Sequence, residues 1–185
     1  IQLHYWKMIK EWTKNAPNRN PQTNINPQNI DPLLIENQSE NITQLIWFGH
    51  SSFLLLIDCK KILIDPVFSQ MPSPVSFFGA KRYSKELPIK AKNLPFIDAV
   101  ILSHDHYDHL DYSTIKKLKG KVGQYFTPLG VGNHLKLWGI SNDKIKELNW
   151  WQNVEFNGVD LVCTPARHFS GRGMFDGAST LWCSW

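Results

Sequence analysis

The sequence has few cysteines and no long apolar run, and each shortage excludes a class of protein. Its 185 residues include only Cys59, Cys163 and Cys183, an odd number at wide spacing. Small disulfide-stapled secreted domains carry even, dense sets of cysteines, so we expect free thiols and a reducing compartment. No apolar stretch approaches the ~20 residues that a membrane-spanning helix needs.

Nothing at the start of the chain has the charged residue and apolar block of a secretory signal. We therefore expect a cytoplasmic location, with peripheral membrane contact as an open alternative. Because the first residue is Ile1 rather than Met, we expect the natural start to lie upstream.

The net charge of +4 is modest and comes from one segment, residues 66–95. This segment has one acidic residue, Glu86, against five basic ones, Lys81, Arg82, Lys85, Lys90 and Lys92. It also contains the apolar residues Phe68, Met71, Val75, Phe77 and Phe78. Two interpretations stay open: a surface that contacts anionic lipid, or a loop that folds onto its own domain. Nucleic acid is not an expected partner, because the basic residues form one loop and no nucleic-acid-binding motif occurs.

The pattern divides the chain into residues 1–43 and residues 44–185. Residues 1–14 carry large apolar side chains at helical spacing, which predicts a short helix packed on the domain or a partner, or alternatively lying on lipid. Residues 15–44 are rich in Asn, Pro and Gln, which predicts an extended surface arm rather than a core element.

From residue 44 onward, short apolar runs alternate with helical patterns. Strands are expected at 44–48, 52–58, 61–65, 97–103, 122–127, 159–164 and 179–185, with a further short apolar segment at 145–148. Helices are expected at 112–119, where Asp111 is the N-cap, and near 130–138. The run 97–102 is almost wholly apolar, as in a strand buried on both faces. This order predicts an α/β (α+β) fold that fits one half of a four-layer αββα sandwich.

Residues 103–111, Ser-His-Asp-His-Tyr-Asp-His-Leu-Asp, follow the buried strand directly. Imidazole and carboxylate are the ligands that catalytic divalent metals prefer, zinc above all. In an extended chain His104 and His106 point the same way and can share one metal. Asp108 and His109 fall where the chain turns into the next helix, so they are free to face a second metal. A rigid strand end is also where α/β folds place their chemistry.

The motif His-x-His-x-Asp-His after a buried strand resembles the signature of the metallo-β-lactamase fold. Its surroundings resemble the N-acyl-phosphatidylethanolamine-hydrolysing phospholipase D branch of that superfamily. The matching segments are residues 47–52, 65–69, 79–83, 97–111, 127–130, 148–151 and 164–168. The resemblance runs from about residue 45 to residue 185, and it implies the N-terminal half of the αββα sandwich.

The resemblance also implies roles for residues outside the motif. His168 matches the family's next metal ligand, and with His104 and His106 it would leave the open fourth position of a catalytic zinc. Asp108 and His109 would serve a second zinc and act in catalysis.

Four further residues are expected around this centre. The resemblance implies that Asp65 supports the ligand histidines from behind. His50 ends a strand and is expected to line the same rim. Arg167 and Arg172 flank His168 and suit a phosphate oxygen, although surface arginines without a role are an equal alternative.

The implied activity is that of a zinc-dependent phosphodiester hydrolase of lipid metabolism. Metal-bound hydroxide would attack the phosphorus of a phospholipid, so that an N-acylethanolamine leaves and phosphatidic acid remains. Another hydrolase of the same fold, a lactonase or a phosphoesterase, and an inactive metal-binding fragment remain alternatives.

The family's full site also needs an aspartate that bridges both metals and a later histidine, which we expect beyond Trp185. Asp176 does not match the bridging position. We therefore expect this chain alone to hold at most one zinc firmly and to hydrolyse weakly or not at all. The sheet face left uncovered would favour self-association.

Overall fold

The computed structural model describes residues 10, 11, 14, 17, 18, 20–39, 42–73, 81–173 and 175–185. The helix expected at 1–14 lies almost entirely outside these residues. Within them, no helix combines the length and the apolar character needed to cross a membrane.

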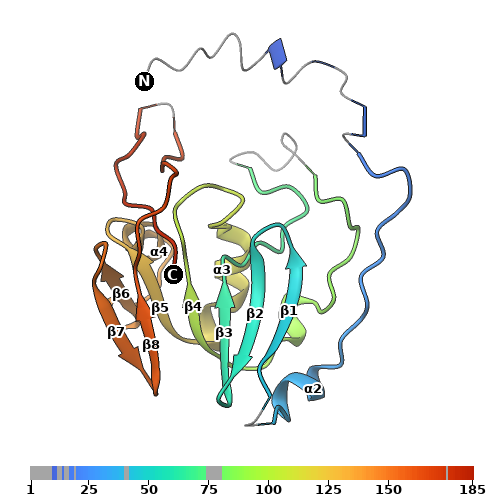
Figure 1. Cartoon of the computed structure of the whole chain (residues 1–185), viewed down its shortest axis with the longest axis horizontal. Coiled ribbons are helices and arrows are strands. Elements are labelled where there is room, and N and C mark those ends of the chain that lie inside the picture. Colours follow the sequence, from blue (N-terminus) through green and yellow to red (C-terminus); the bar gives the residue numbers. More distant parts are fainter. Residues whose placement is uncertain are drawn as a thin grey trace.

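A six-stranded mixed sheet forms the centre of the fold (Figure 1). Its strands lie side by side in chain order: β1 (Gln44–Gly49), β2 (Ser52–Ile57), β3 (Lys60–Ile64), β4 (Ile97–Ile101), β5 (Val122–Pro128) and β6 (Ile145–Leu148). The first three strands form an antiparallel meander, and β3 to β6 pair in parallel. The parallel strands end at the same edge of the sheet, and the loops that follow them meet there.

Helices cover one face of the sheet and a hairpin packs on the other. Figure 1 shows α3 (Tyr112–Leu118) and α4 (Gly132–Leu137) behind the sheet. Asp111 caps α3 as expected, accepting a hydrogen bond from the Ser113 N–H at 3.2 Å. The hairpin β7–β8 (Asn153–Phe156 and Val159–Val162) contributes to a second core with β4 and β5. The apolar alternation explains both cores, because Leu54 and Leu56 of β2 point to the helices and Leu55 and Ile57 point away.

Three short 3₁₀ turns complete the described secondary structure: η1 (Ala91–Asn93), η2 (Lys119–Lys121) and η3 (Asn142–Lys144).

The prediction of a last strand at 179–185 is wrong. Only one isolated bridge forms there, between Thr164 and Ser184, and the strand expected at 159–164 ends at Val162. The backbone of this segment instead donates hydrogen bonds to loops, from Leu181 to Leu129 O at 2.8 Å and from Cys183 to Ser103 O at 2.9 Å. Strand β7 was not predicted.

The arm at residues 20–36 is more than a surface segment. It follows the outer side of β1 (Figure 1), where the Ile30 N–H donates to Pro88 O at 2.9 Å. Its helix α2 (Pro32–Glu36) begins at Asp31, whose side chain accepts from the Leu33 N–H. Ile35 is fully buried in the helix-side core, which corrects the expectation of an arm without a core role.

The segment 66–95 is anchored to the core at both ends. Phe68 is buried, and its ring packs on Phe48 with 5.0 Å between centroids. For Phe68 this burial favours the second of the two open interpretations, a loop that folds onto its own domain. Ile89 and Leu94 are buried as well. The residues at 74–80 lie outside the described part, so membrane contact by that stretch stays a prediction.

Part of the sheet face opposite the helices is uncovered within the described residues. Leu45 lies directly opposite Leu55, and Trp47 opposite Phe53, so all four share that face. Leu45 and Trp47 are each 59% exposed. Self-association through this face remains a prediction.

Candidate metal centre

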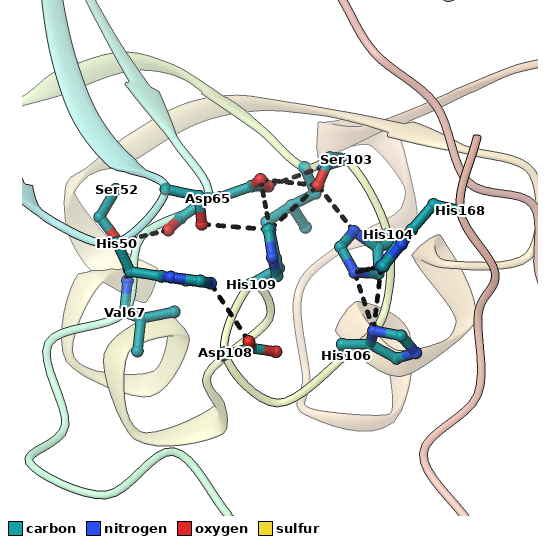
Figure 2. Close-up of polar contacts among 12 residues, drawn as sticks. His50, Ser52, Asp65, Val67, Ser103, His104, His106, Asp108, His109 and His168 are labelled. Atoms are coloured by element: carbon teal, nitrogen blue, oxygen red, sulfur yellow. Dashed lines mark hydrogen bonds and ion pairs between the residues drawn. The ribbon is translucent and has the colours of Figure 1, made fainter. Parts of the chain in front are cut away.

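Three histidines converge at the C-terminal edge of the parallel strands. His104 and His106 follow β4, and His168 comes from the segment after β8 (Figure 2). The His104 Nε2 atom lies 3.0 Å from His106 Nδ1 and 3.0 Å from His168 Nε2. His168 Nε2 lies 3.3 Å from His106 Nδ1. A proton can join only one pair of these nitrogens at a time, whereas one cation contacts all three.

The spacing of these nitrogens fits a tetrahedral ion. Zn–N bonds of about 2.0–2.1 Å at tetrahedral angles separate two ligand nitrogens by roughly 3.3 Å. Burial, helped by the neighbouring imidazoles of His109, His106 and His168, lowers the pKa of His104 to about 2. Burial also lowers the pKa of His106. Both rings are thus neutral near pH 7, with lone pairs available for a cation.

A second group lies beside the first: His50, Asp108 and His109 (Figure 2). Their donor atoms all lie within 4.8 Å of one another, and His50 Nε2 is 3.2 Å from Asp108 Oδ2. The rings of His104 and His109 have centroids 4.0 Å apart, so the two groups adjoin. The sequence predicted Asp108 and His109 together, but it placed His50 only on the rim.

Asp65, for which the family resemblance implied a supporting role, lies beside His109 of the second group. Its buried carboxylate accepts from the Ser103 N–H at 2.7 Å and from Ser103 Oγ at 2.6 Å. It also lies 2.8 Å from His109 Nδ1, which leaves the His109 Nε2 atom facing the second group. Asp65 has a φ of +40°, an uncommon conformation for a non-glycine residue, held by Ser52 Oγ donating to its carbonyl.

Asp105 is a residue of this centre that sequence reasoning missed. Its buried carboxylate accepts from the Gly171 N–H at 2.8 Å and from Thr180 Oγ1 at 3.0 Å, and it lies 3.6 Å from His134 Nε2. Burial by itself raises the pKa of Asp105, but the hydrogen bonds from His134, Gly171 and Thr180 outweigh it and lower that pKa to about 2. Asp105 thus ties the segment after His168 to the loop of His104 and His106.

The two arginines differ in their surroundings. The guanidinium of Arg172 donates to the carbonyls of Asp105 and Leu110 and lies 4.0 Å from the ring centroid of Tyr107. Arg172 therefore holds the loop that carries His104, His106, Asp108 and His109 in place. Arg167 is exposed and makes no hydrogen bond or ion pair with any other residue of the described part. Contact of either arginine with a phosphate stays a prediction.

Comparison with known proteins places this chain in a family. A family model described as the beta-lactamase superfamily domain matches residues 60–185, more than half of the chain. The chain belongs to this superfamily. It is 47% identical over 140 residues to an uncharacterized protein of Mycobacterium bovis, covering 75% of this chain and 37% of that protein.

Two other superfamily relatives have functional names. An N-acyl-phosphatidylethanolamine-hydrolyzing phospholipase D 1 of Caenorhabditis elegans is 38% identical over 148 residues, covering 75% of this chain and 41% of that protein. A metal-dependent hydrolase of Pyrobaculum islandicum is 34% identical over 134 residues, covering 70% and 52%. The chain thus spans between 37% and 52% of the length of these three relatives.

The fold is shared with a solved structure as well. CmlA, a diiron beta-hydroxylase from Streptomyces venezuelae, superposes with a TM-score of 0.51 at 23% identity, covering 66% of this chain and 24% of that one. The predicted metallo-β-lactamase-like fold is therefore confirmed. The chain has a metallo-β-lactamase fold and is related to metal-dependent hydrolases.

Proposed function

We propose that this chain is the metal-binding half of a zinc-dependent hydrolase that cleaves the phosphodiester of an N-acyl phospholipid. The observation that carries the proposal is the convergence of His104, His106 and His168 next to a second donor group, whose His50 and Asp108 line an apolar cavity. Similarity to a phospholipase D of N-acyl-phosphatidylethanolamine supports the choice of substrate.

The cavity has a volume of about 710 Å³ and includes His50 and Asp108 of the second group in its wall. This volume lies in the range of small-molecule sites. Most of the remaining wall is apolar and comes from the arm and from β1: Ile25, Pro27, Ile30, Leu45, Ile46, Trp47 and Phe48. An acyl chain lying there would have its polar end at the candidate metal centre.

Arg82 gives the same cavity a positive charge. Its guanidinium donates to Val67 O at 2.7 Å and to Phe48 O, and its buried Nε–H has no partner among the described residues. Burial lowers the pKa of Arg82, yet a guanidinium stays charged at neutral pH. In this proposal Arg82 faces the anionic oxygens of the substrate's phosphodiester.

The roles of the remaining residues follow from their positions. His104, His106 and His168 would hold one cation through three nitrogens, and Asp108 and His109 would contribute to a second. When bound, such cations lower the pKa of water to about 7 and stabilise charge on a phosphoryl oxygen. Asp65 fixes the His109 ring, and the apolar wall excludes water from the acyl chain.

The test is a single-turnover assay with the metal-loaded chain in excess over long-chain N-acyl-phosphatidylethanolamine in mixed micelles. Mass spectrometry measures the N-acylethanolamine released, and elemental analysis of the chain identifies the metal. We expect wild type to release product and His106→Asn to release at least ~100-fold less, because ligand loss exceeds the 10- to 100-fold cost of losing a supporting residue. The exposed Asp160→Asn serves as the matched control and should equal wild type.

Three results would contradict the proposal in different ways. Equal product from wild type and His106→Asn rejects hydrolysis at this centre. Turnover of a lactone without turnover of the phospholipid selects the lactonase alternative. Metal bound by His104, His106 and His168 with no turnover of either substrate selects the inactive fragment.

A further inference from the structure

We propose that His50 is itself a metal ligand, and that with Asp108 and His109 it forms a second three-donor site built entirely from this chain. This inference rests on the metal centre of the proposed function and extends it. The sequence indicated only Asp108 and His109 for a second metal within these residues and placed the missing ligands beyond Trp185, so it predicted at most one firmly held zinc. The present inference revises that expectation to two.

The first support is the geometry of the donors. His50 Nε2 lies 3.2 Å from Asp108 Oδ2, close to the roughly 3.3 Å that separates two ligands of a tetrahedral zinc. The Nδ1 atom of His109 is engaged by Asp65, so its Nε2 atom is the one available to this group. A carboxylate behind a histidine is the arrangement that orients metal ligands in proteins. All three donors lie within 4.8 Å of one another.

The second support is the turn that presents His50. Gly49 and His50 have φ values of +99° and +49°, so the chain has positive φ at the last residue of β1 and at the residue that follows it. The His50 carbonyl is held there by the Trp47 indole, whose Nε1–H donates at 2.9 Å. Positive φ is uncommon in non-glycine residues, although histidine adopts it more often than most, and glycine would adopt the same conformation without the steric cost.

An ion pair between His50 and Asp108 does not account for this arrangement. Their side chains are 60% and 52% exposed, and exposed pairs contribute only about 0–1 kcal/mol. The His50 ring also stands edge-on to the His109 ring, with 5.1 Å between centroids. Imidazole, carboxylate and imidazole around one point are the donor set that zinc and similar ions take.

The experiment counts zinc ions on the full 185-residue chain. Protein stripped with chelator is dialysed against buffered Zn²⁺, and bound zinc is measured by elemental analysis. We expect two zinc ions per wild-type chain and one per chain of His50→Asn, with the second binding step at least ~100-fold weaker. Asparagine tolerates the left-handed conformation, so this variant preserves the turn while it removes the imidazole. Asp160→Asn should keep two ions.

Should His50→Asn unfold, as judged by circular dichroism, His50→Gly replaces it, because glycine adopts this φ freely. One ion on both wild type and variant overturns the inference and leaves the His104, His106 and His168 site of the proposed function intact. Two ions on both also overturns it. No zinc on either protein removes the metal centre of the proposed function together with the inference.

Discussion

Replacing Asp105 with alanine should loosen the metal centre without touching any candidate ligand. The Asp105 carboxylate is buried and accepts hydrogen bonds from Gly171 and Thr180, which lie in the segment that follows His168. Asp105→Ala leaves the Gly171 N–H and the Thr180 hydroxyl without a partner inside the protein. It also removes two of the hydrogen bonds that tie this segment to the loop of His104 and His106, whereas those of Arg172 remain.

The size of the effect follows from these contacts. A buried donor without a partner costs about 1–3 kcal/mol, so two of them lower the free energy of unfolding by about 2–6 kcal/mol. For a chain of this length each kcal/mol shifts the melting temperature by roughly 2–4 °C. We therefore expect Asp105→Ala to melt roughly 4–24 °C below wild type. Asp105→Asn keeps an acceptor for the Gly171 N–H and should lose about half as much.

Thermal unfolding followed by circular dichroism measures this loss, with the exposed Asp160→Ala as the control, expected within ~0.5 kcal/mol of wild type. A second readout tests positioning: zinc affinity of the first site should fall by about 10- to 100-fold in Asp105→Ala, as it does when a residue supporting a ligand is lost. Equal stability and zinc affinity for Asp105→Ala and Asp160→Ala would refute this reasoning.

Three other results are expected. Tyr125→Phe should raise the free energy of unfolding by about 1 kcal/mol in urea titrations, because the buried Tyr125 hydroxyl has no partner among the described residues; a lower value would reveal a partner. Burial raises the pKa of the Cys163 and Cys183 thiols, so at pH 8 a thiol reagent should modify only the exposed Cys59 in folded protein and all three cysteines after denaturation. Two or more fast thiols would contradict this burial. Removing metal with chelator should lower the melting temperature and adding zinc should restore it, since an ion at 100 times its Kd stabilises by about 2.7 kcal/mol; a melting temperature indifferent to chelator would argue against a bound metal.

Local features of the sequence predicted the elements that hold the centre. Alternating apolar residues predicted the meander β1–β3, and the apolar run 97–102 predicted β4 and the ligand loop after it. His168 was reachable only through the family resemblance, because its neighbours His104 and His106 lie 64 and 62 residues away in the chain. Strand β7 left a usable signal, since Asn157-Gly158 with positive φ at both residues is typical of a tight hairpin turn.

The features that the sequence did not predict depend on contacts between segments that are far apart in the chain. Period-two alternation points Asp105 away from His104 and His106, but nothing local indicates that Gly171 and Thr180 meet it there. Arg172 illustrates the same difficulty, because its sequence position suited a phosphate while its guanidinium in fact donates to backbone carbonyls. The expected strand at 179–185 failed because its N–H groups found acceptors in loops rather than in a neighbouring strand.

The three histidines come from two segments that are far apart in the chain, one after β4 and one after β8, so an ion bound to all three is a cross-link between these segments. An ion that joins His106 to His168 closes a loop of 62 residues. Closing a loop of this length costs the chain conformational entropy. Such a clasp would form only after the β7–β8 hairpin has docked on the sheet. Binding of the ion is then coupled to folding, so that free metal would shift the equilibrium toward the folded protein.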